Sequence, residues 1–448
     1  MPYATCQHTD PQQRFTLASP RYGCYPAPEL FEPAPSSFEY LKHLRATRPN
    51  LAALSLYVHL PFCTSACYHC ERASVIGAEP HVIASYLEAL KQEIRLVSAH
   101  IDKRQLVERL HVGGGTPALL SHEQMRSLMS TLHEHMMLLE SAGDYSIELD
   151  PRVADWAMVG TLRELGFNRV QIRVQALTEA VQNAINRHPT LRQVRALVEA
   201  ARTLQFASVG VDLVIGLPEQ TLEGMNYTLE RMLALQPDRV VLKTYQHKPW
   251  QRHINANRLP HIDYTLGMLK HCEQALRAGG YIELGMGHFV LADDDLALAQ
   301  DEQALRFDLN GYSSHNAQHL IGLGLGAISQ VGGLYTRNST SVEHYQHLLL
   351  QKQLPITLQR LTSLDEQMRA YVIEQLHCHA QIDFARFKHH FNLGFTEHFN
   401  ALEQDLQALA NQNLIGYSAQ HLTLNQRSRE VLLRLCRLFD AHATTLET

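Results

Sequence analysis

Three cysteines lie within eight residues of one another, in the segment Cys63-Thr-Ser-Ala-Cys67-Tyr-His-Cys70. The spacing C-x₃-C-x₂-C puts three soft sulfur ligands on one loop, and such ligands select zinc or an iron–sulfur cluster. A structural zinc normally takes four ligands, so His59 or His69 would have to complete a Cys₃His zinc site. A four-iron cluster held by three cysteines leaves one iron with an open position. The spacing therefore predicts a metal centre and leaves both metals open.

Other unusual residues accompany short apolar runs that are typical of strands. The run 109–112 is followed by Gly113-Gly-Gly-Thr116, and the run 145–149 contains Glu148 and precedes Asp150. Backbone N–H groups of a triple-glycine turn can approach a ligand closely because no Cβ intervenes. Glu148 and Asp150 are two residues apart and so share a strand face, which suits hydroxyl or ammonium groups. We expect these groups to gather at the carboxyl ends of parallel strands.

From about residue 54 onward, apolar β-rich runs alternate with helical patterns. The expected strands are residues 56–60, 109–112, 145–149, 169–174, 209–215 and 239–244, and the expected helices are 84–98, 122–138, 154–165, 191–204 and 222–235. Such repeated alternation predicts an α/β fold of parallel βαβ units with right-handed crossovers, closed into a partial (β/α) barrel. A doubly wound open sheet is the structural alternative.

The two ends of the chain lack the alternation of strand and helix patterns. Residues 1–50 are rich in proline and predict an extended N-terminal arm that leads into a helix near 37–45. The C-terminal patterns predict helices and one hairpin, at 364–377, 382–391, 396–410, 414–417 with 421–424, and 426–441. We therefore expect three domains: an arm over 1–50, a partial barrel over 51–345, and a helical, winged-helix-like domain over 346–448.

Composition narrows the classes of function. The 448 residues include 39 basic and 45 acidic residues, for a net charge of −6, without a long Lys/Arg run, so no nucleic-acid partner is expected. Neither a signal peptide nor an apolar run of membrane-spanning length is visible, so we expect a cytoplasmic protein without a membrane partner. The 8 cysteines, three clustered and the rest scattered, do not form the pattern of a disulfide framework.

The cysteine spacing, its position after a strand and the following glycine motif resemble the radical S-adenosylmethionine superfamily. The resemblance extends over nearly the whole chain to one of its families, the oxygen-independent coproporphyrinogen III oxidases (coproporphyrinogen dehydrogenases). The motifs that carry it include Leu54-Ser-Leu-Tyr-Val-His-Leu-Pro-Phe-Cys63, His111-Val-Gly-Gly-Gly-Thr-Pro117, Ser146-Ile-Glu-Leu-Asp-Pro-Arg152, Gly216-Leu-Pro-Glu-Gln-Thr221 and the N-terminal Arg21-Tyr22 and Tyr25-Pro26.

The resemblance implies two kinds of cofactor. One [4Fe-4S] cluster would be held by Cys63, Cys67 and Cys70. S-adenosylmethionine bound to that cluster would contact Tyr57, Gly114, Glu148 and Ile328. Positions for a second S-adenosylmethionine would be Gly115, Thr116, Gln175, Arg187 and Asp212, together with His69 and Gln246. No catalytic side chain is implied beyond the cofactor radical.

The implied reaction is the oxidative decarboxylation of two propionates of coproporphyrinogen III to vinyl groups by a 5′-deoxyadenosyl radical. The product would be protoporphyrinogen IX, in haem biosynthesis. Implied partners are the tetrapyrrole substrate, an electron donor such as flavodoxin or ferredoxin, and an electron acceptor whose identity stays open. The protein is expected to be a monomer.

Three positions depart from the pattern of the family. Arg72 stands where a fourth cysteine is usual, Arg173 stands where glycine is usual, and the arm reads Arg21-Tyr-Gly-Cys-Tyr-Pro26 where Thr-Ser usually separates the tyrosines. By the period of two, Arg173 shares a face with Gln175, where it could clamp a carboxylate or block part of the cavity. The alternatives are thus a divergent radical methyltransferase or other tetrapyrrole-modifying enzyme, and a haem-trafficking protein.

Overall fold

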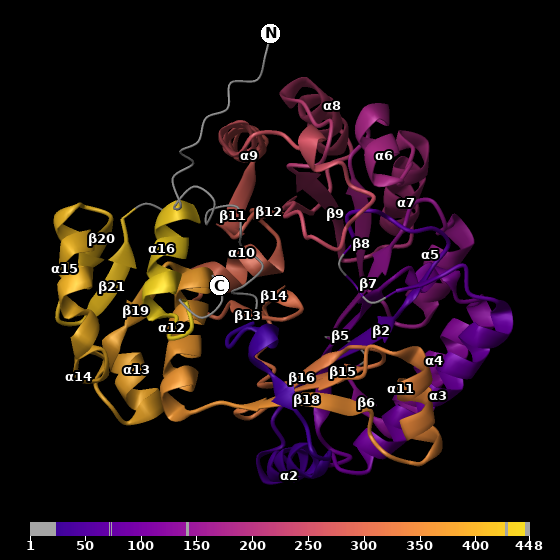
Figure 1. Cartoon of the computed structure of the whole chain (residues 1–448), viewed down its shortest axis with the longest axis horizontal. Coiled ribbons are helices and arrows are strands. Elements are labelled where there is room, and N and C mark those ends of the chain that lie inside the picture. Colours follow the sequence, from indigo (N-terminus) through magenta and orange to yellow (C-terminus); the bar gives the residue numbers. More distant parts are fainter. Residues whose placement is uncertain (1–23, 71, 73, 140–142, 426–428, 444–448) are drawn as a thin grey trace. The chain divides into compact units, whose positions relative to one another are not determined.

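The computed structural model describes residues 24–70, 72, 74–139, 143–425 and 429–443. It divides into two compact units (Figure 1). The larger unit comprises the described residues of Leu30–Tyr281 and His315–Leu361, and the smaller comprises the described residues of Met1–Glu29, Ile282–Ser314 and Thr362–Thr448. The expected motif Arg21-Tyr22 lies outside the described residues. The expected domain limits at 50 and 345 stay predictions.

The larger unit is built on a sheet with the strand order β1-β18-β17-β16-β15-β2-β5-β7-β8-β9-β10. Its strands are β1 (Glu32–Pro33), β2 (Leu54–Leu60), β5 (Leu106–Gly114), β7 (Asp144–Leu149), β8 (Arg169–Gln175), β9 (Ser208–Ile215), β10 (Arg239–Thr244), β15 (His319–Leu323), β16 (Ile328–Val331), β17 (Leu334–Asn338) and β18 (Ile356–Leu361). Neighbouring strands from β15 to β10 run parallel. The parallel α/β prediction is therefore confirmed.

Helices connect the parallel strands and form an outer row beside them (Figure 1). The helices of this unit are α2 (Phe38–Ala46), α3 (Pro80–Ser98), α4 (His122–His135), α5 (Trp156–Glu164), α6 (Glu179–Ile185), α7 (Leu191–Thr203), α8 (Leu222–Leu233), α9 (Ile262–Ala278) and α11 (Val342–Leu350). Capping boxes start two of them, with Ser121 and Gln124 before α4 and Thr190 and Gln193 before α7. Side chains at helical spacing fix the buried face, as Val194, Leu197, Val198 and Ala201 do in α7.

The residue ranges of these strands and helices lie close to the predicted ranges, with one exception among the helices. All eight residues of β9 are buried, as expected of a strand that is covered on both faces. The helix predicted over 122–138 is wrong at its end, because α4 stops at His135. Met136 is extended, and Met137–Leu138 form the short strand β6, which pairs with β5. Pairing with the sheet outweighs the helical pattern there.

The smaller unit includes the C-terminal helices and a three-stranded sheet of order β19-β21-β20. Its elements are β12 (His288–Leu291), α10 (Asp295–Asp301), β13 (Arg306–Asp308), β14 (Gly311–Ser313), α12 (Leu364–His379), β19 (Gln381–Asp383), α13 (Phe384–Phe391), α14 (Phe395–His398), α15 (Glu403–Asn411), β20 (Ile415–Tyr417), β21 (His421–Leu424) and α16 (Arg429–Phe439). The strand β11 (Tyr281–Gly285) crosses the limit between the units. The helix predicted over 396–410 is wrong as a single helix, since a 3₁₀ turn at Asn400–Leu402 divides it.

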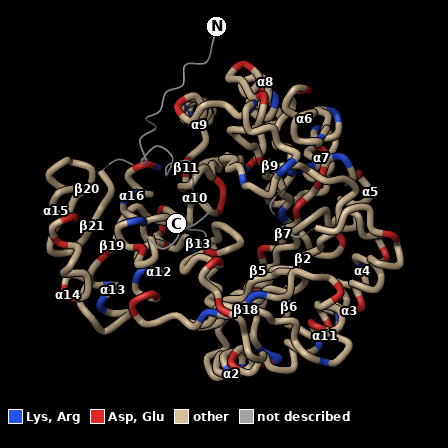
Figure 2. Tube along the Cα trace, in the orientation of Figure 1, with Lys and Arg blue, Asp and Glu red and all other residues tan. Residues whose placement is uncertain are grey.

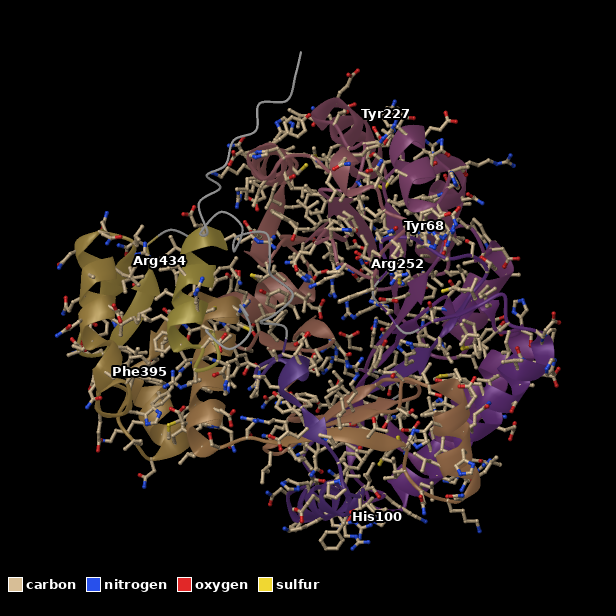
Figure 3. The ribbon with its side chains drawn as sticks, in the orientation of Figure 1. Tyr68, His100, Tyr227, Arg252, Phe395 and Arg434 are labelled. Atoms are coloured by element: carbon tan, nitrogen blue, oxygen red, sulfur yellow. The ribbon has the colours of Figure 1, made fainter. Side chains whose placement is uncertain are left out.

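An aromatic core holds the C-terminal helices together. Phe395, labelled in Figure 3, stacks on Phe384 with ring centroids 4.2 Å apart and packs edge to face against Phe387. Tyr25 belongs to the same core, and its hydroxyl accepts a hydrogen bond from the backbone N–H of Ala441 at 3.0 Å. The first described residues of the expected arm therefore pack with the C-terminal helices.

Surface charge is mixed along the outer helices. Lys and Arg positions alternate with Asp and Glu positions over α3 and α4 (Figure 2). Among the described residues, no helix is both long and apolar enough to cross a bilayer.

Candidate active site

The cysteine loop, residues 63–70, follows the carboxyl end of β2. It begins with the short strand β3 (Phe62–Cys63), which pairs in parallel with β4 (Val75–Ile76). The loop rests on the end of α6, where the N–H of Tyr68 donates to the Ile185 carbonyl at 3.0 Å. Three half-buried side chains of this loop are free thiols: Cys63, Cys67 and Cys70.

A second segment, residues 245–258 after β10, contacts the cysteine loop. The Gln251 amide donates to the His69 carbonyl at 2.9 Å, and His253 stacks on Tyr68 with ring centroids 4.8 Å apart. Figure 3 labels Tyr68 and Arg252 in this part of the larger unit. The Nδ1 atom of His69 is buried and has no hydrogen-bond partner among the described residues. Burial, assisted by nearby guanidinium groups, lowers the pKa of His69 to about 3, so its imidazole is neutral at neutral pH.

Hydrogen-bond donors surround two of the sulfur atoms. Arg152 Nη2 and Arg187 Nη1 lie 3.6 and 3.8 Å from Cys67 Sγ, and Thr116 Oγ1 lies 3.9 Å from Cys63 Sγ. Positive charge beside a cysteine favours its thiolate, which is the form that binds metal. The surroundings of Cys67 therefore suit metal-bound sulfur, whereas burial raises the pKa of the Cys63 thiol.

Two metal centres are compatible with the chemistry of the loop. Within the part of the chain that the structure describes, no three His, Cys, Asp or Glu side chains are placed to hold a single metal ion. A Cys₃His zinc site brings four ligands to one ion, whereas the cysteines of a four-iron cluster bind different irons. The arrangement of the side chains alone leaves both centres open.

Glu148, on β7, is almost completely buried and is held by two guanidinium groups. Arg72 Nη1 lies 2.5 Å from Oε2 and Arg72 Nη2 lies 2.9 Å from Oε1, while Arg173 Nη1 lies 3.3 Å from Oε2. The N–H of Gly114 also donates to Oε2, at 3.3 Å. Burial alone would raise the pKa of Glu148, but the two guanidinium groups outweigh burial and hold this pKa well below its usual range.

Asp150, just beyond the end of β7, forms a separate group. It accepts from Arg152 Nη2 at 2.7 Å and from Arg187 Nη1 at 2.6 Å. These are the two arginines that contact Cys67, so the carboxylate and the sulfur share their donors. Burial opposes ionisation of Asp150, yet hydrogen bonds and charge from Arg152 and Arg187 lower its pKa below the usual value.

The glycine turn differs from expectation. The N–H of Gly115 donates to the Leu60 carbonyl and that of Thr116 to the Phe62 carbonyl, both at 2.7 Å. A Cβ on Gly115 would lie 2.4 Å from the Phe62 carbonyl oxygen, so only glycine fits. Because the N–H of Gly114 serves Glu148, these three donors bind the protein itself. The turn joins β5 to the cysteine loop, and it does not present a row of N–H groups to a ligand.

The other expected contact residues are spread across the sheet. Tyr57, on β2, stacks on His111 with centroids 5.9 Å apart, and burial raises the pKa of Tyr57 to about 12. Asp212, on β9, pairs with Lys243 Nζ and accepts from the Gln171 amide, at 2.5 and 2.6 Å. The remaining two, Gln246 after β10 and Ile328 at the start of β16, are half-buried.

Gln175 ends β8 in the left-handed region, with φ at 71°. The register of β8 on β9 shifts between Arg173 and Gln175. The strict alternation of β8 is therefore interrupted, but both side chains still affect the pKa of His69, so their common face stays a prediction. Arg173 reaches across to Glu148 and to the carbonyl of Gly114.

Sequence reasoning missed two functional contacts. The pairing of Arg152 with Asp150 and Cys67 was not expected, although the motif Ser146–Arg152 contains both charged residues. The pairing of Arg72 with Glu148 was also not expected. The signal that could have found this pairing is the presence of two unexpected cations, Arg72 and Arg173, beside the expected carboxylate of Glu148.

Comparisons with known proteins first define the class. The Radical SAM superfamily model matches residues 57–232, which contain the cysteine loop, Glu148 and Asp150, and the HemN C-terminal domain model matches residues 362–431. The structure of coproporphyrinogen III oxidase (HemN) from Escherichia coli, described as a radical SAM enzyme, aligns with a TM-score of 0.89. Its sequence is 32% identical, over 94% of this chain and 97% of that chain. The chain therefore has the mixed α/β fold of a radical SAM enzyme with a C-terminal HemN domain.

Full-length relatives identify the family. The oxygen-independent coproporphyrinogen III oxidase of Pseudomonas aeruginosa is 42% identical over 97% of this chain and 95% of its own length. The Salmonella typhimurium protein of the same name is 34% identical over 96% of this chain and 94% of its own length. The chain belongs to the oxygen-independent coproporphyrinogen III oxidase family.

The superfamily implies a [4Fe-4S] cluster and S-adenosylmethionine, and the site has features that fit both. Three free thiols on one loop provide soft ligands, with donors beside two of the sulfurs. The buried Nδ1 of His69 supplies a polar atom without a protein partner among the described residues. Glu148 is a buried, ionised carboxylate suited to an ammonium or hydroxyl group.

Proposed function

We propose that this chain converts two propionate side chains of coproporphyrinogen III into vinyl groups without oxygen, giving protoporphyrinogen IX in haem biosynthesis. For each propionate, a hydrogen atom leaves the β-carbon, carbon dioxide leaves the carboxyl end, and one electron passes to an acceptor. The observation that carries this proposal is the full-length similarity to enzymes named for that reaction, including the 42% identical relative.

The proposed cofactor ligands are those expected from the sequence. Cys63, Cys67 and Cys70 hold the cluster. Tyr57, Gly114, Glu148 and Ile328 contact the S-adenosylmethionine bound to it. A second S-adenosylmethionine is bound by Gly115, Thr116, Gln175, Arg187 and Asp212, with His69 and Gln246. When bound, these groups supply the one-electron chemistry that removes the hydrogen atom.

The protein supplies electrostatic support for this chemistry. Arg152 and Arg187 lie between Asp150 and Cys67 and compensate negative charge on both. Charge-assisted contacts of this kind orient metal ligands and tune their electronic character. Asp150 thereby fixes the two arginines that stabilise a thiolate at Cys67.

The segment 245–258 provides cations for the substrate carboxylates. It contains Lys248, Arg252 and Arg258 and no acidic residue. Arg258 pairs with Glu219, whereas the side chains of Lys248 and Arg252 form no ion pair with a described residue. Because this segment contacts the cysteine loop through Gln251, its unpaired cations suit propionates held near the cofactors.

The remaining proposals concern partners and architecture. The tetrapyrrole is the substrate, a reduced flavodoxin or ferredoxin delivers electrons, and a separate acceptor takes the electron released at decarboxylation. The sheet of the larger unit curves into a partial barrel, residues 1–50 form an arm, and residues 346–448 form a winged-helix-like domain. The protein acts as a monomer.

An anaerobic product assay tests the proposed reaction. The protein, reconstituted with iron and sulfide, is incubated with coproporphyrinogen III, a chemical reductant and S-adenosylmethionine, and the tetrapyrrole products are identified by mass spectrometry. We expect successive losses that correspond to two decarboxylated propionates. Cleavage of S-adenosylmethionine without a vinyl product would overturn the proposal, and a gain of CH₂ would establish the methyltransferase alternative.

A further inference from the structure

Two arginines, Arg72 and Arg173, converge on one buried carboxylate. Glu148 accepts a bidentate pair from Arg72 and a further bond from Arg173, and its own side chain is 5% exposed. Two guanidinium groups on one carboxylate leave a local excess of one positive charge. Such an excess suits a ligand that brings an anion to the site.

The two arginines differ in their freedom to move. Arg173 is part of β8, and its side chain is 16% exposed. Arg72 follows the cysteine loop outside any helix or strand, and its side chain is 34% exposed. Both donate to the carbonyl of Gly114, at 3.1 Å from Arg72 and 3.2 Å from Arg173. Arg72 is therefore the outer partner, which can leave Glu148 while Arg173 and the N–H of Gly114 keep holding it.

The amino acid part of S-adenosylmethionine carries one ammonium and one carboxylate. The pair of Glu148 and Arg72 presents the complementary anion and cation, already in contact. When such a zwitterion enters between them, each protein charge exchanges one partner for another of the same sign. No buried charge is left without a partner during that exchange, which avoids the large cost of an isolated buried ion.

We propose that Arg72 is a cofactor-binding residue that pairs with Glu148 in the free protein and with the carboxylate of S-adenosylmethionine in the complex. Glu148 then takes the ammonium, and Arg173 keeps Glu148 in place. This inference rests on the proposed cofactor site. The competing possibility is that Arg72 only blocks Glu148, and the two roles predict opposite effects of removing the guanidinium group.

The binding of two adenosine thioethers distinguishes the cofactor-binding role of Arg72 from the blocking role, and this measurement does not require catalytic turnover. S-adenosylhomocysteine keeps the amino acid part, 5′-methylthioadenosine lacks it, and neither carries a sulfonium charge. Equilibrium dialysis measures both dissociation constants for the wild-type protein and for Arg72→Gln, at matched iron and sulfide content. We expect Arg72→Gln to weaken S-adenosylhomocysteine binding about tenfold or more and to leave 5′-methylthioadenosine binding unchanged. Arg72→Lys, which keeps the charge but not the planar fork, should recover part of the loss.

The matched control is Arg126→Gln, which removes an exposed ion pair with Glu164 and should change neither constant. Equal or tighter binding of S-adenosylhomocysteine to Arg72→Gln overturns the inference, and tighter binding establishes the blocking role. An equal loss for both thioethers also overturns it, because the defect would then not involve the amino acid part. If the wild-type protein bound neither S-adenosylhomocysteine nor S-adenosylmethionine, the proposed cofactor site itself would fail.

Discussion

Glu148 and Asp150 are buried carboxylates two residues apart in the chain, and each binds two arginines. The arginines of Asp150 are enclosed, with side chains of Arg152 and Arg187 that are 15% and 4% exposed. The outer arginine of Glu148, Arg72, is 34% exposed. Asp150 with Arg152 and Arg187 therefore forms a closed charge group, which is buried and contacts the cysteine loop. Glu148 with Arg72 and Arg173 forms a charge group whose outer arginine can move toward a ligand.

A third buried carboxylate shows what the arginines contribute. Glu93, on α3, accepts hydrogen bonds from neutral donors: the Tyr345 hydroxyl at 2.5 Å, the Asn338 amide at 2.7 Å and the N–H of Gly324 at 2.8 Å. Burial raises its pKa to about 7, although each hydrogen bond lowers it in part. Where burial is similar, neighbouring cations therefore decide whether a carboxyl group is ionised at neutral pH.

The largest effect is expected from substitution of Cys67, where the closed group of Asp150, Arg152 and Arg187 contacts the cysteine loop. Cys67→Ala removes a proposed cluster ligand and the sulfur that Arg152 and Arg187 contact. We expect this variant to lose nearly all cluster iron after reconstitution, as measured by iron and sulfide content. Cys272→Ala, at a buried free thiol of α9, is the control and should retain iron. Full iron content in Cys67→Ala would show that Cys67 is not a ligand.

Asp150→Asn should destabilise the fold by about 3–5 kcal/mol, because Arg152 and Arg187 would lose their buried anion. The pKa of folded Asp150 is lowered, so its stabilising contribution is complete at neutral pH and is lost as pH falls below about 4. Urea unfolding should therefore show a smaller difference between wild type and variant at pH 3 than at pH 6. The same difference at both pH values would contradict the charge pairing.

Glu93 should give the opposite pH dependence. Its folded pKa of about 7 lies above its usual value, so the proton bound by the native state stabilises the fold at low pH. That contribution, about 3–4 kcal/mol, is lost as pH rises from about 4.5 to 7. Glu93→Gln should remove this slope from urea unfolding measured between pH 5 and pH 8. Glu88→Gln, at an exposed position of the same helix, should keep the slope, and a slope retained by Glu93→Gln would refute the assignment.

Glu148→Gln should have the smallest cost, about 1–2 kcal/mol. Breaking a buried ion pair is expensive when the remaining charge stays buried, but Arg72 can turn toward water. The free energy of unfolding of this variant, measured beside Asp150→Asn, tests the comparison directly. Equal losses of unfolding free energy in the two variants would mean that the arginines of Glu148 are as confined as those of Asp150.

Local patterns were sufficient to predict the parallel strands and the cysteine loop. The run expected over 145–149 is the strand Asp144–Leu149, and the run expected over 239–244 is Arg239–Thr244. These strands are apolar runs bounded by polar loops, which the sequence displays without reference to other segments. The turn at Asn400–Leu402 and the end of α4 were missed because both depend on packing between segments.

The pairings at the site could not be read from spacing alone. Arg72 and Glu148 are separated by 76 positions, and their contact depends on the order of β2, β5 and β7 in the sheet. Arg173 reaches Glu148 because β8 lies beside β7. Sequence patterns indicate which faces are buried, but not which strand lies next to which. The sequence could therefore single out these residues as candidates, but it could not give their partners.

Both ends of the cysteine loop are tied by main-chain hydrogen bonds. The N–H groups of Gly115 and Thr116 bind the carbonyls before the loop, while the Val75 and Gly77 N–H groups bind the Pro61 and Cys63 carbonyls at 2.7 and 2.9 Å. These bonds do not depend on side-chain identity. The segment between the anchors can therefore exchange one residue type for another during evolution while its entry and exit stay fixed. Such tolerance explains how an arginine can stand at position 72, where the sequence resemblance led us to expect a thiol.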